Sequence, residues 1–427
     1  MKRRVLCIIL AALGLPSALF ADEAAALRIE RKIRDRHMPY LGIIDPVFAS
    51  ADSTEIVSYT RCGDSATWTG HYLAAEAYRY NVTKSPEART NIMDALNGIR
   101  KLVEATGNDM LARCAVPVDS PYASAIVSEE SAHGVHVAAI DGIPHFWVGN
   151  TSRDQYIGVF FGLTAAFQMV QDQEVHDWVS MLATRMLVAL MDRHWQITMP
   201  DGTVSSSFIG RPDQQLAMLK LGRRMNPNVF ESDYKWRANT YAYAVPAPIL
   251  VETRDLYNSY FKFNLDYAAM YMLLTSGDST WIRTHYKNAF DILRKATDDH
   301  DNAHFDMVTV AITGRTAQMD ERAPRLLDAW LKRSDRDFWT DLHPLYASCN
   351  GDDNQSCTVV PVEQRVATDF LWQRSPFQLW GGWLGTTESA GIDYLLPYWM
   401  ARYHGMMTER LGPSSRPDRR PGRLVSQ

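Results

Sequence analysis

Three carboxylic acids stand where they could serve acid–base chemistry. Asp64 lies in "RCGDSATWTG", Asp154 lies in "SRDQYIG", and Glu388 lies in "GTTESAG". Asp64 and Asp154 each precede an aromatic residue closely, at the start of a segment with helical character. Two carboxyl groups that face one cleft can cleave a glycosidic bond, because one protonates the leaving oxygen while the other activates water or attacks carbon.

A simpler role is open to each aspartate. The first N–H groups of a helix lack partners within the helix, and a carboxylate there can cap them. Asp154 is nevertheless our first choice for a general acid or base, with Asp64 and Glu388 as alternative partners. We expect Arg153 to orient Asp154 or to contact the substrate, and a guanidinium beside Asp154 would lower its pKa and favour the role of base.

Aromatic and basic side chains near these segments could bind a sugar, because aromatic faces and imidazoles commonly line such sites. A guanidinium matches the carboxylate of a uronate with two hydrogen bonds, although Arg237 could equally lie at the surface. Glycines 381 and 382 would let the backbone at the late tryptophans approach a ligand, although tryptophan is more often a core residue. The predicted substrate-binding residues are Arg153, Tyr156, Trp68, His71, His145, Trp236, Arg237, Trp380 and Trp383.

Other chemistries find little support in the sequence. His133 and His136 lack the spacing of a zinc-protease helix, and no paired Cys/His set follows. The segment "ATDDHDNAHFD" lacks the glycine and the final glutamate of a calcium loop, so a solvated helix end is expected there. Phosphate-binding loops and the G-x-S-x-G elbow are absent from the sequence. We therefore expect no metal and no cofactor.

The elements that must position these residues form a repeated helical hairpin. The first helix of each unit is small and aromatic, as in "TWTGHYLAAEAYRY", "DQYIGVFFGLTAAFQMV" and "FNLDYAAMYMLL". The second is amphipathic, as in "WIRTHYKNAFDILRKATDD", where Ile282, Tyr286, Ala289 and Leu293 share one face. A helix that is apolar all round must be buried on every side, so each hairpin supplies one inner and one outer helix. The predicted fold is all-α, in one large domain.

Such hairpins can form a ring or an open solenoid of stacked helix pairs. Variable spacing and long aromatic inserts favour the ring. The segments "TWTGHYLAAEAYRY", "SRDQYIGVFFGLTAAF" and "SPFQLWGGWLG" resemble the six-hairpin glycosidase superfamily, the (α/α)6 toroids, and within it the unsaturated glucuronyl hydrolase-like and related uronate-processing enzymes. The resemblance implies a toroid over residues 22–408 with a substrate cavity at one end of the ring.

The two ends of the chain indicate an exported protein. Residues 1–21, "MKRRVLCIILAALGLPSALFA", have the basic start, apolar run and small residues of a signal peptide. Residues 409–427 are rich in arginine and proline and predict a disordered tail. We expect a periplasmic or secreted protein without a membrane span. A net charge of −5 argues against a nucleic-acid partner.

Four cysteines remain after removal of the predicted signal peptide. In an oxidising compartment we expect the disulfides Cys62–Cys114 and Cys349–Cys357, with four free buried thiols as the alternative.

Together these features predict an exported hydrolase of glycosidic bonds, acting on an acidic oligo- or polysaccharide. A polysaccharide lyase on the same scaffold is one alternative, with Tyr156 or His145 removing a proton and Arg153 neutralising a uronate. A non-catalytic glycan-binding protein is another. Fold analogy does not decide among them.

Overall fold

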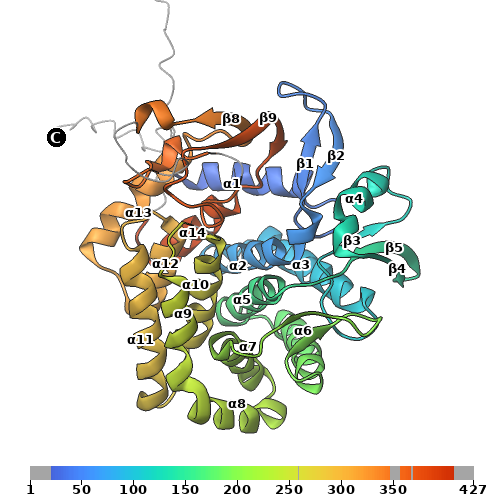
Figure 1. Cartoon of the computed structure of the whole chain (residues 1–427), viewed down its shortest axis with the longest axis vertical. Coiled ribbons are helices and arrows are strands. Elements are labelled where there is room, and N and C mark those ends of the chain that lie inside the picture. Colours follow the sequence, from blue (N-terminus) through green and yellow to red (C-terminus); the bar gives the residue numbers. More distant parts are fainter. Residues whose placement is uncertain (1–20, 258, 347–355, 367–368, 408–427) are drawn as a thin grey trace, which may run out of the picture.

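The computed structural model describes residues 21–257, 259–346, 356–366 and 369–407, and these are mostly helical (Figure 1). The predicted signal peptide and tail fall almost entirely outside the described residues. Residue 22 caps the first helix, because the Asp22 side chain accepts a hydrogen bond from the N–H of Ala25 at 2.7 Å. Among the described helices, none is long and apolar enough to cross a membrane.

Six inner helices contact one another in a closed cycle. Each packs against the next in chain order, and the last packs against the first. Most of their sequences are small and aromatic without a polar face, which burial on all sides requires, whereas the inner helix Pro212–Met225 also carries polar residues such as Asp213 and Lys220. An open stack of hairpins would leave its first and last inner helices apart, so the closure favours the ring. The inner helices are α2 (Ser65–Thr83), α5 (Arg153–Met169), α7 (Pro212–Met225), α10 (Phe261–Leu274), α12 (Ala303–Thr313) and α14 (Ile392–Tyr403).

Each inner helix has an amphipathic outer partner. In α11, the predicted apolar face of Ile282, Tyr286, Ala289 and Leu293 is buried. The sixth pair joins the two ends of the described chain, because α1 packs against α14. The outer helices are α1 (Glu23–Lys32), α3 (Pro86–Ala105), α6 (Gln173–Asp192), α8 (Pro227–Tyr241), α11 (Thr280–Thr297) and α13 (Ala317–Trp330).

The prediction of an all-α chain is wrong in the inserts, which form small antiparallel sheets at the periphery (Figure 1). One sheet has the order β2-β1-β9-β8, from Ile56–Thr60, Asp45–Phe48, Trp380–Glu388 and Arg336–Asp341. A second has the order β3-β5-β4, from Cys114–Pro117, Ile143–Val148 and Val135–Ile140. The third pairs β6 (Gln196–Thr198) with β7 (Val204–Ser207).

The hairpin of β4 and β5 lies in the long insert between α3 and α5. Its turn is Asp141–Gly142, and both residues have positive φ, 52° and 78°. Asp-Gly is a favoured pair for a two-residue hairpin turn, because both positions need a left-handed backbone. The short helices α4 (Ala123–Glu129) and α9 (Pro246–Glu252) lie in other inserts.

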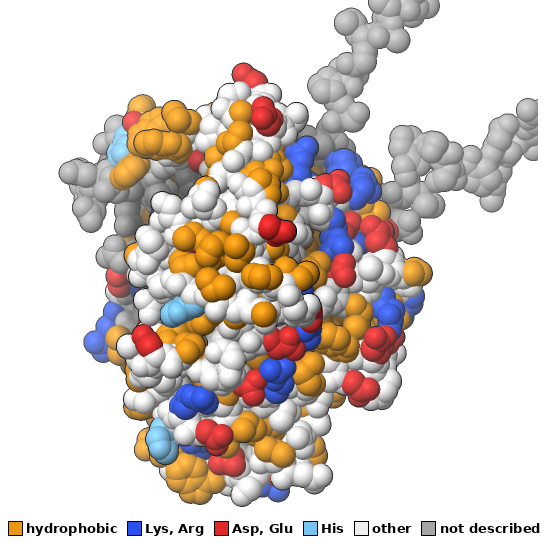
Figure 2. All heavy atoms as spheres, turned by 90° about the vertical axis from the view of Figure 1, so that its right-hand side faces the viewer, with side chains coloured by type: hydrophobic (Ala, Val, Ile, Leu, Met, Phe, Trp, Pro, Cys, Tyr) orange, Lys and Arg blue, Asp and Glu red, His pale blue; other side chains and the backbone are white. Residues whose placement is uncertain are grey.

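The surface beside β3, β4 and β5 carries mixed charge. Figure 2 shows lysine and arginine side chains interspersed with aspartate and glutamate there, with hydrophobic side chains gathered near the middle. No field of a single sign dominates this face, in line with the small net charge of the chain.

Glycines bring α2 and α5 into direct backbone contact. A Cβ atom on Gly162 would lie 2.2 Å from the carbonyl oxygen of Gly70, and one on Gly70 would lie 2.1 Å from that of Gly158. Gly70 and Gly158 hold equivalent places in the two predicted repeats, and in the fold they face each other. This close approach fixes where the two helices begin relative to one another.

Candidate active site

Asp64 and Asp154 come together at the adjoining starts of α2 and α5. Gln155 lies between them: its Nε2 is 3.4 Å from Asp64 Oδ1 and 3.3 Å from Asp154 Oδ2. The structure therefore gathers the two aspartates that the sequence singled out, and adds a bridging amide that the sequence did not indicate. Both carboxyl groups are half-buried.

Neither aspartate caps its helix through a hydrogen bond to the backbone in the part of the chain that the structure describes. Asp64 occupies the N-cap position of α2 without a side-chain cap, and the N-cap of α5 is Ser152. Gln155 does the capping across the helix pair, because its Oε1 accepts from the N–H of Thr67 at 3.0 Å. Ser152 Oγ donates to Asp154 instead. The capping role thus loses its support for both residues.

The surroundings of Asp64 favour its protonated form. Burial, together with the negative charge of Asp154, raises the pKa of Asp64 to about 6, although the cations Arg113 and Arg61 oppose the shift. Arg113 is fixed at this place by the carbonyl oxygen of Gly63 at 2.9 Å and by Ser152 Oγ at 2.8 Å. A carboxyl group with such a pKa can hold a proton near neutrality and still release it.

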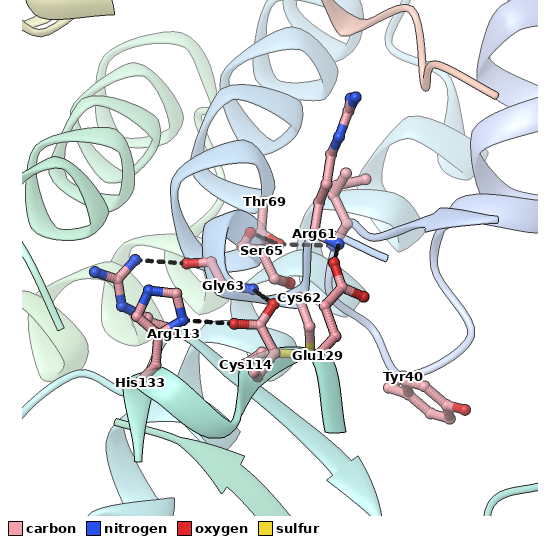
Figure 3. Close-up of a disulfide and its surroundings, with 12 residues drawn as sticks. Tyr40, Arg61, Cys62, Gly63, Ser65, Thr69, Arg113, Cys114, Glu129 and His133 are labelled. Carbon is pink, nitrogen blue, oxygen red and sulfur yellow. Dashed lines mark hydrogen bonds and ion pairs between the residues drawn. A yellow bond between two sulfur atoms is a disulfide. The ribbon is translucent and has the colours of Figure 1, made fainter. Parts of the chain in front are cut away.

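A disulfide anchors the segment that carries Asp64 (Figure 3). Cys62 lies two residues before Asp64 and is bonded to Cys114 on β3, with a Cα–Cα distance of 5.5 Å. Glu130 adds a second anchor, because its Oε1 accepts from the N–H of Gly63 at 2.6 Å. The predicted bond Cys62–Cys114 is confirmed. Cys349 lies outside the described residues, so its bond to Cys357 stays a prediction.

Arg61, Asp369 and Arg374 extend the site outward. Arg61 Nη1 lies 3.2 Å from Asp369 Oδ1 and 3.1 Å from Asp45 Oδ2. The other oxygen of Asp369 pairs with Arg374. Arg374 lines a cavity of about 330 Å³ with polar and aromatic walls, which include Tyr260, Gln373, Gln378 and Trp380. Arg61 and Asp369 also act on the pKa of Asp64, so Asp64 is coupled electrostatically to the side chains beside the cavity that Trp380 helps to form.

Arg153 does not hold Asp154, so the first of its two expected roles is not found, and contact with a substrate stays a prediction. Its Nη1 donates to the carbonyl oxygen of Ser207 on β7 at 3.2 Å. Ser152 and Gln155 contact the Asp154 carboxylate in its place. Arg153 therefore ties the start of α5 to the β6–β7 hairpin.

Glu388 lies in a separate buried ion cluster at the end of β9. Arg36 Nη1 is 3.0 Å from Glu388 Oε2, His37 Nε2 is 3.4 Å from Oε1, and Arg336 Nε is 3.6 Å from Oε2. Burial pushes the pKa of Glu388 up, but His37, Lys32 and Arg36 outweigh it and lower the pKa to about 2. The carboxylate is ionised and fully engaged, so it does not suit a general acid.

Four of the predicted substrate-binding residues lie in the core. Trp68 packs against Phe261, Phe370 and Trp372. The fully buried His71 has Nε2 3.1 Å from Asn264 Nδ2, and burial lowers its pKa to about 4. Tyr156 is 0% exposed and its hydroxyl accepts from the N–H of Leu111 at 2.9 Å. His145 is also buried. These four side chains therefore pack inside the protein and are not free to contact a substrate.

The remaining predicted residues occupy two other surfaces. Trp380 and Trp383 lie on β9 and are 38% and 66% exposed. Trp339 on β8 joins them, with its ring centroid 5.5 Å from that of Trp380. Trp236 is exposed on α8, and the adjacent Arg237 lines the largest of the cavities that we describe.

Metal binding finds no support within the described ranges, where no group of three or more His, Cys, Asp or Glu side chains is suited to hold an ion. We predicted that the whole segment "ATDDHDNAHFD" is solvated, but only Asp298 and Asp299 are exposed. Asp306 is buried and pairs with Arg322 at 2.9 Å and Arg294 at 3.0 Å. Asp306 therefore neutralises two arginines and is not arranged to bind a metal ion.

Comparison with known proteins gives one distant similarity. The family models and the curated proteins contain no match to this chain. Among solved structures, the chain is similar to cellobiose 2-epimerase from Spirochaeta thermophila, with a TM-score of 0.42 and 8% sequence identity. The similarity covers 90% of this chain and 97% of that protein, and it is too distant to carry a conclusion about activity.

Proposed function

We propose that this protein is an exported enzyme that hydrolyses a glycosidic bond in an acidic, uronate-containing oligosaccharide, on an (α/α)6 scaffold of six helical hairpins. The observation that carries the proposal is the pair of carboxyl groups joined by Gln155, one of which has a raised pKa. Helix capping does not account for the pair, and no cofactor is required.

Asp64 is the proposed general acid and Asp154 the proposed general base. As the bond from the anomeric carbon to the leaving oxygen breaks, Asp64 gives its proton to that oxygen. Asp154 accepts a proton from water as the water oxygen bonds to the anomeric carbon. The raised pKa of Asp64 suits the acid, and the ionised Glu388 is not needed for either role.

The cavity beside Arg374 is the proposed place for the acidic sugar. Arg374 is about half-exposed, so its guanidinium can meet a uronate carboxylate while Asp369 holds it in position. Trp380 offers an aromatic face at the same cavity. Replacing Trp380 by Ala should raise KM while the melting temperature changes little.

The lyase alternative is less favoured, because its proposed bases are enclosed. Tyr156 is buried with its hydroxyl engaged, and burial raises its pKa far above the usual value. His145 is buried and its Nδ1 lies 2.8 Å from the carbonyl oxygen of Ile143. A proton at C5 of a bound uronate would have no open path to either group.

The test is turnover by the full mature chain on plant and bacterial acidic polysaccharides and their oligosaccharides. Hydrolysis should release reducing ends without absorbance from an unsaturated uronate, and Asp64→Asn should slow it clearly. Absorbance of an unsaturated product would assign a lyase. Binding without turnover across the panel would assign a glycan-binding protein. Release of a protein that begins at Asp22 into the periplasm or medium would test the export step.

A further inference from the structure

The largest cavity that we describe is lined by residues of α6, α7, α8 and α9 and of their connections, and neither Asp64 nor Asp154 lines it. Figure 1 shows where these four helices lie. Its volume is about 680 Å³, within the range of sites for small molecules. Most of its wall is apolar, from Met191, Ile209, Pro212, Ala247, Pro248 and Val251. A sugar ring presents hydroxyl groups around its edge, whereas the side chains of this wall that can form hydrogen bonds are a minority of the lining, namely His194, Trp195, Gln215, Arg237 and Tyr241. The cavity therefore does not suit the substrate proposed above.

Gln215 and Arg237 form a hydrogen-bonded pair in the wall of the cavity. Gln215 orients the guanidinium: its Oε1 accepts from Arg237 Nη1 at 2.9 Å, and its own Nε2 donates to the carbonyl oxygen of Phe208 at 2.8 Å. Arg237 Nε is buried and has no hydrogen-bond partner among the residues that the structure describes. The edge formed by Nε and Nη2 is one that binds a carboxylate with two parallel hydrogen bonds.

Trp195 supplies a second donor of the same kind. Its side chain is 3% exposed and lines the cavity, and its Nε1 also lacks a partner within the described chain. The Arg237 guanidinium carbon lies 5.1 Å from the centre of the Trp195 ring. A buried donor without an acceptor is costly unless a ligand or water satisfies it. Two such donors therefore belong to neighbouring side chains that line the cavity.

We propose that this cavity binds a small molecule with a carboxylate group on an apolar body, such as an acyl or aryl carboxylate. The carboxylate accepts from Arg237 and Trp195, and the apolar body fills the space against α7 and α9. Ile209 and Val251 are more than half exposed at the rim, so a longer apolar body can continue outward. The inference is independent of the proposed glycosidase activity.

The experiment titrates the full mature protein with three probes and follows binding by calorimetry and by tryptophan fluorescence. Decanoate carries both parts of the proposed ligand, decanol lacks the carboxylate, and glucuronate lacks the apolar body. Decanoate should bind at least tenfold more tightly than decanol, and glucuronate should not bind here.

Two variants assign the binding to this cavity. Arg237→Gln should reduce decanoate affinity to that of decanol, on the order of a tenfold loss or more, because a charge-assisted pair is removed. Ala247→Phe should block both apolar probes by filling the space. Arg325→Gln, at an exposed position on α13, is the matched control and should bind like the unchanged protein.

Three results would overturn the proposal. The first is tight binding of glucuronate in competition with decanoate, which would make the cavity a sugar site. The second is decanoate binding that Arg237→Gln leaves unchanged, since the ligand would then lie elsewhere. The third is the absence of binding by all probes to protein whose circular dichroism shows a folded state.

Discussion

Two carboxylate sites in this molecule have opposite electrostatics, although desolvation raises the pKa at both. Asp64 faces a second carboxyl group, and its pKa rises to about 6. Glu388 faces Arg36, His37 and Arg336, and its pKa falls to about 2. Burial pushes both values up, so the neighbouring charges decide the outcome. The charges around a carboxyl group therefore distinguish a candidate for proton transfer, such as Asp64, from a group that stabilises the fold, such as Glu388.

The two sites should also contribute to the stability of the fold with opposite signs. A buried carboxylate among cations contributes stability that is lost when it is removed. A carboxyl group held beside another carboxyl group costs stability, and such strain is typical of catalytic positions. Substitutions at the two sites should therefore move stability in opposite directions, and only one site should affect turnover.

The largest effect is expected from Asp154→Asn. The change is nearly isosteric and keeps a group that can accept from Ser152, but it removes the base. Turnover on the substrate found by the screen should fall by about a hundredfold or more. Asp119→Asn, at an exposed position, is the control and should keep normal turnover. Near-normal turnover of a folded Asp154→Asn protein would remove Asp154 from the mechanism.

Glu388→Gln should change stability and leave the chemistry intact. Its loss leaves Arg36 and Arg336 without this buried carboxylate, while His37 keeps its contact with Asp45, and we expect a cost of about 4 kcal/mol in the free energy of unfolding. Because the pKa of Glu388 is lowered, its contribution is complete above pH 4.5 and is lost as the pH falls towards 2.

Denaturant unfolding at pH 7 and pH 3 would measure the loss of stability in Glu388→Gln, with Glu321→Gln at an exposed position as the control. A stable Glu388→Gln protein that had lost turnover would return Glu388 to the list of catalytic candidates.

Gly162→Ala tests whether the glycine contact positions the carboxyl pair. Its Cβ would lie 2.2 Å from the carbonyl oxygen of Gly70, so α2 and α5 must move apart. We expect a loss of about 3 kcal/mol in stability and a fall in turnover within the folded fraction. Gly277→Ala places its Cβ in open space and should be nearly neutral. Full turnover by folded Gly162→Ala would show that the spacing of the helices is not critical.

The sequence predicted the elements better than the directions of their side chains. The 3.6-residue pattern correctly gave the buried faces of the outer helices, because burial on one side requires it. Tyr156 stands two residues after Asp154 on one helix, and such neighbours face different sides, so it lies in the core. The Gln155 bridge and the contact of Arg153 with β7 depend on long-range packing, which one sequence does not specify. The Asp-Gly pair at residues 141–142 is a signal in the sequence that could have predicted the β4–β5 hairpin.

The smallest expected effect is a gain of stability in Asp64→Asn. The folded protein holds the Asp64 proton up to about pH 6, whereas an unfolded aspartate releases it near 3.8. Between these values the unfolded chain binds fewer protons, so this residue destabilises the protein as pH rises, and the penalty is complete above pH 6. Asn carries no such penalty. Relative to the unchanged protein, the variant should gain about 2 kcal/mol between pH 4 and pH 8. Chemical denaturation at both pH values measures the gain, and a constant difference would contradict the raised pKa.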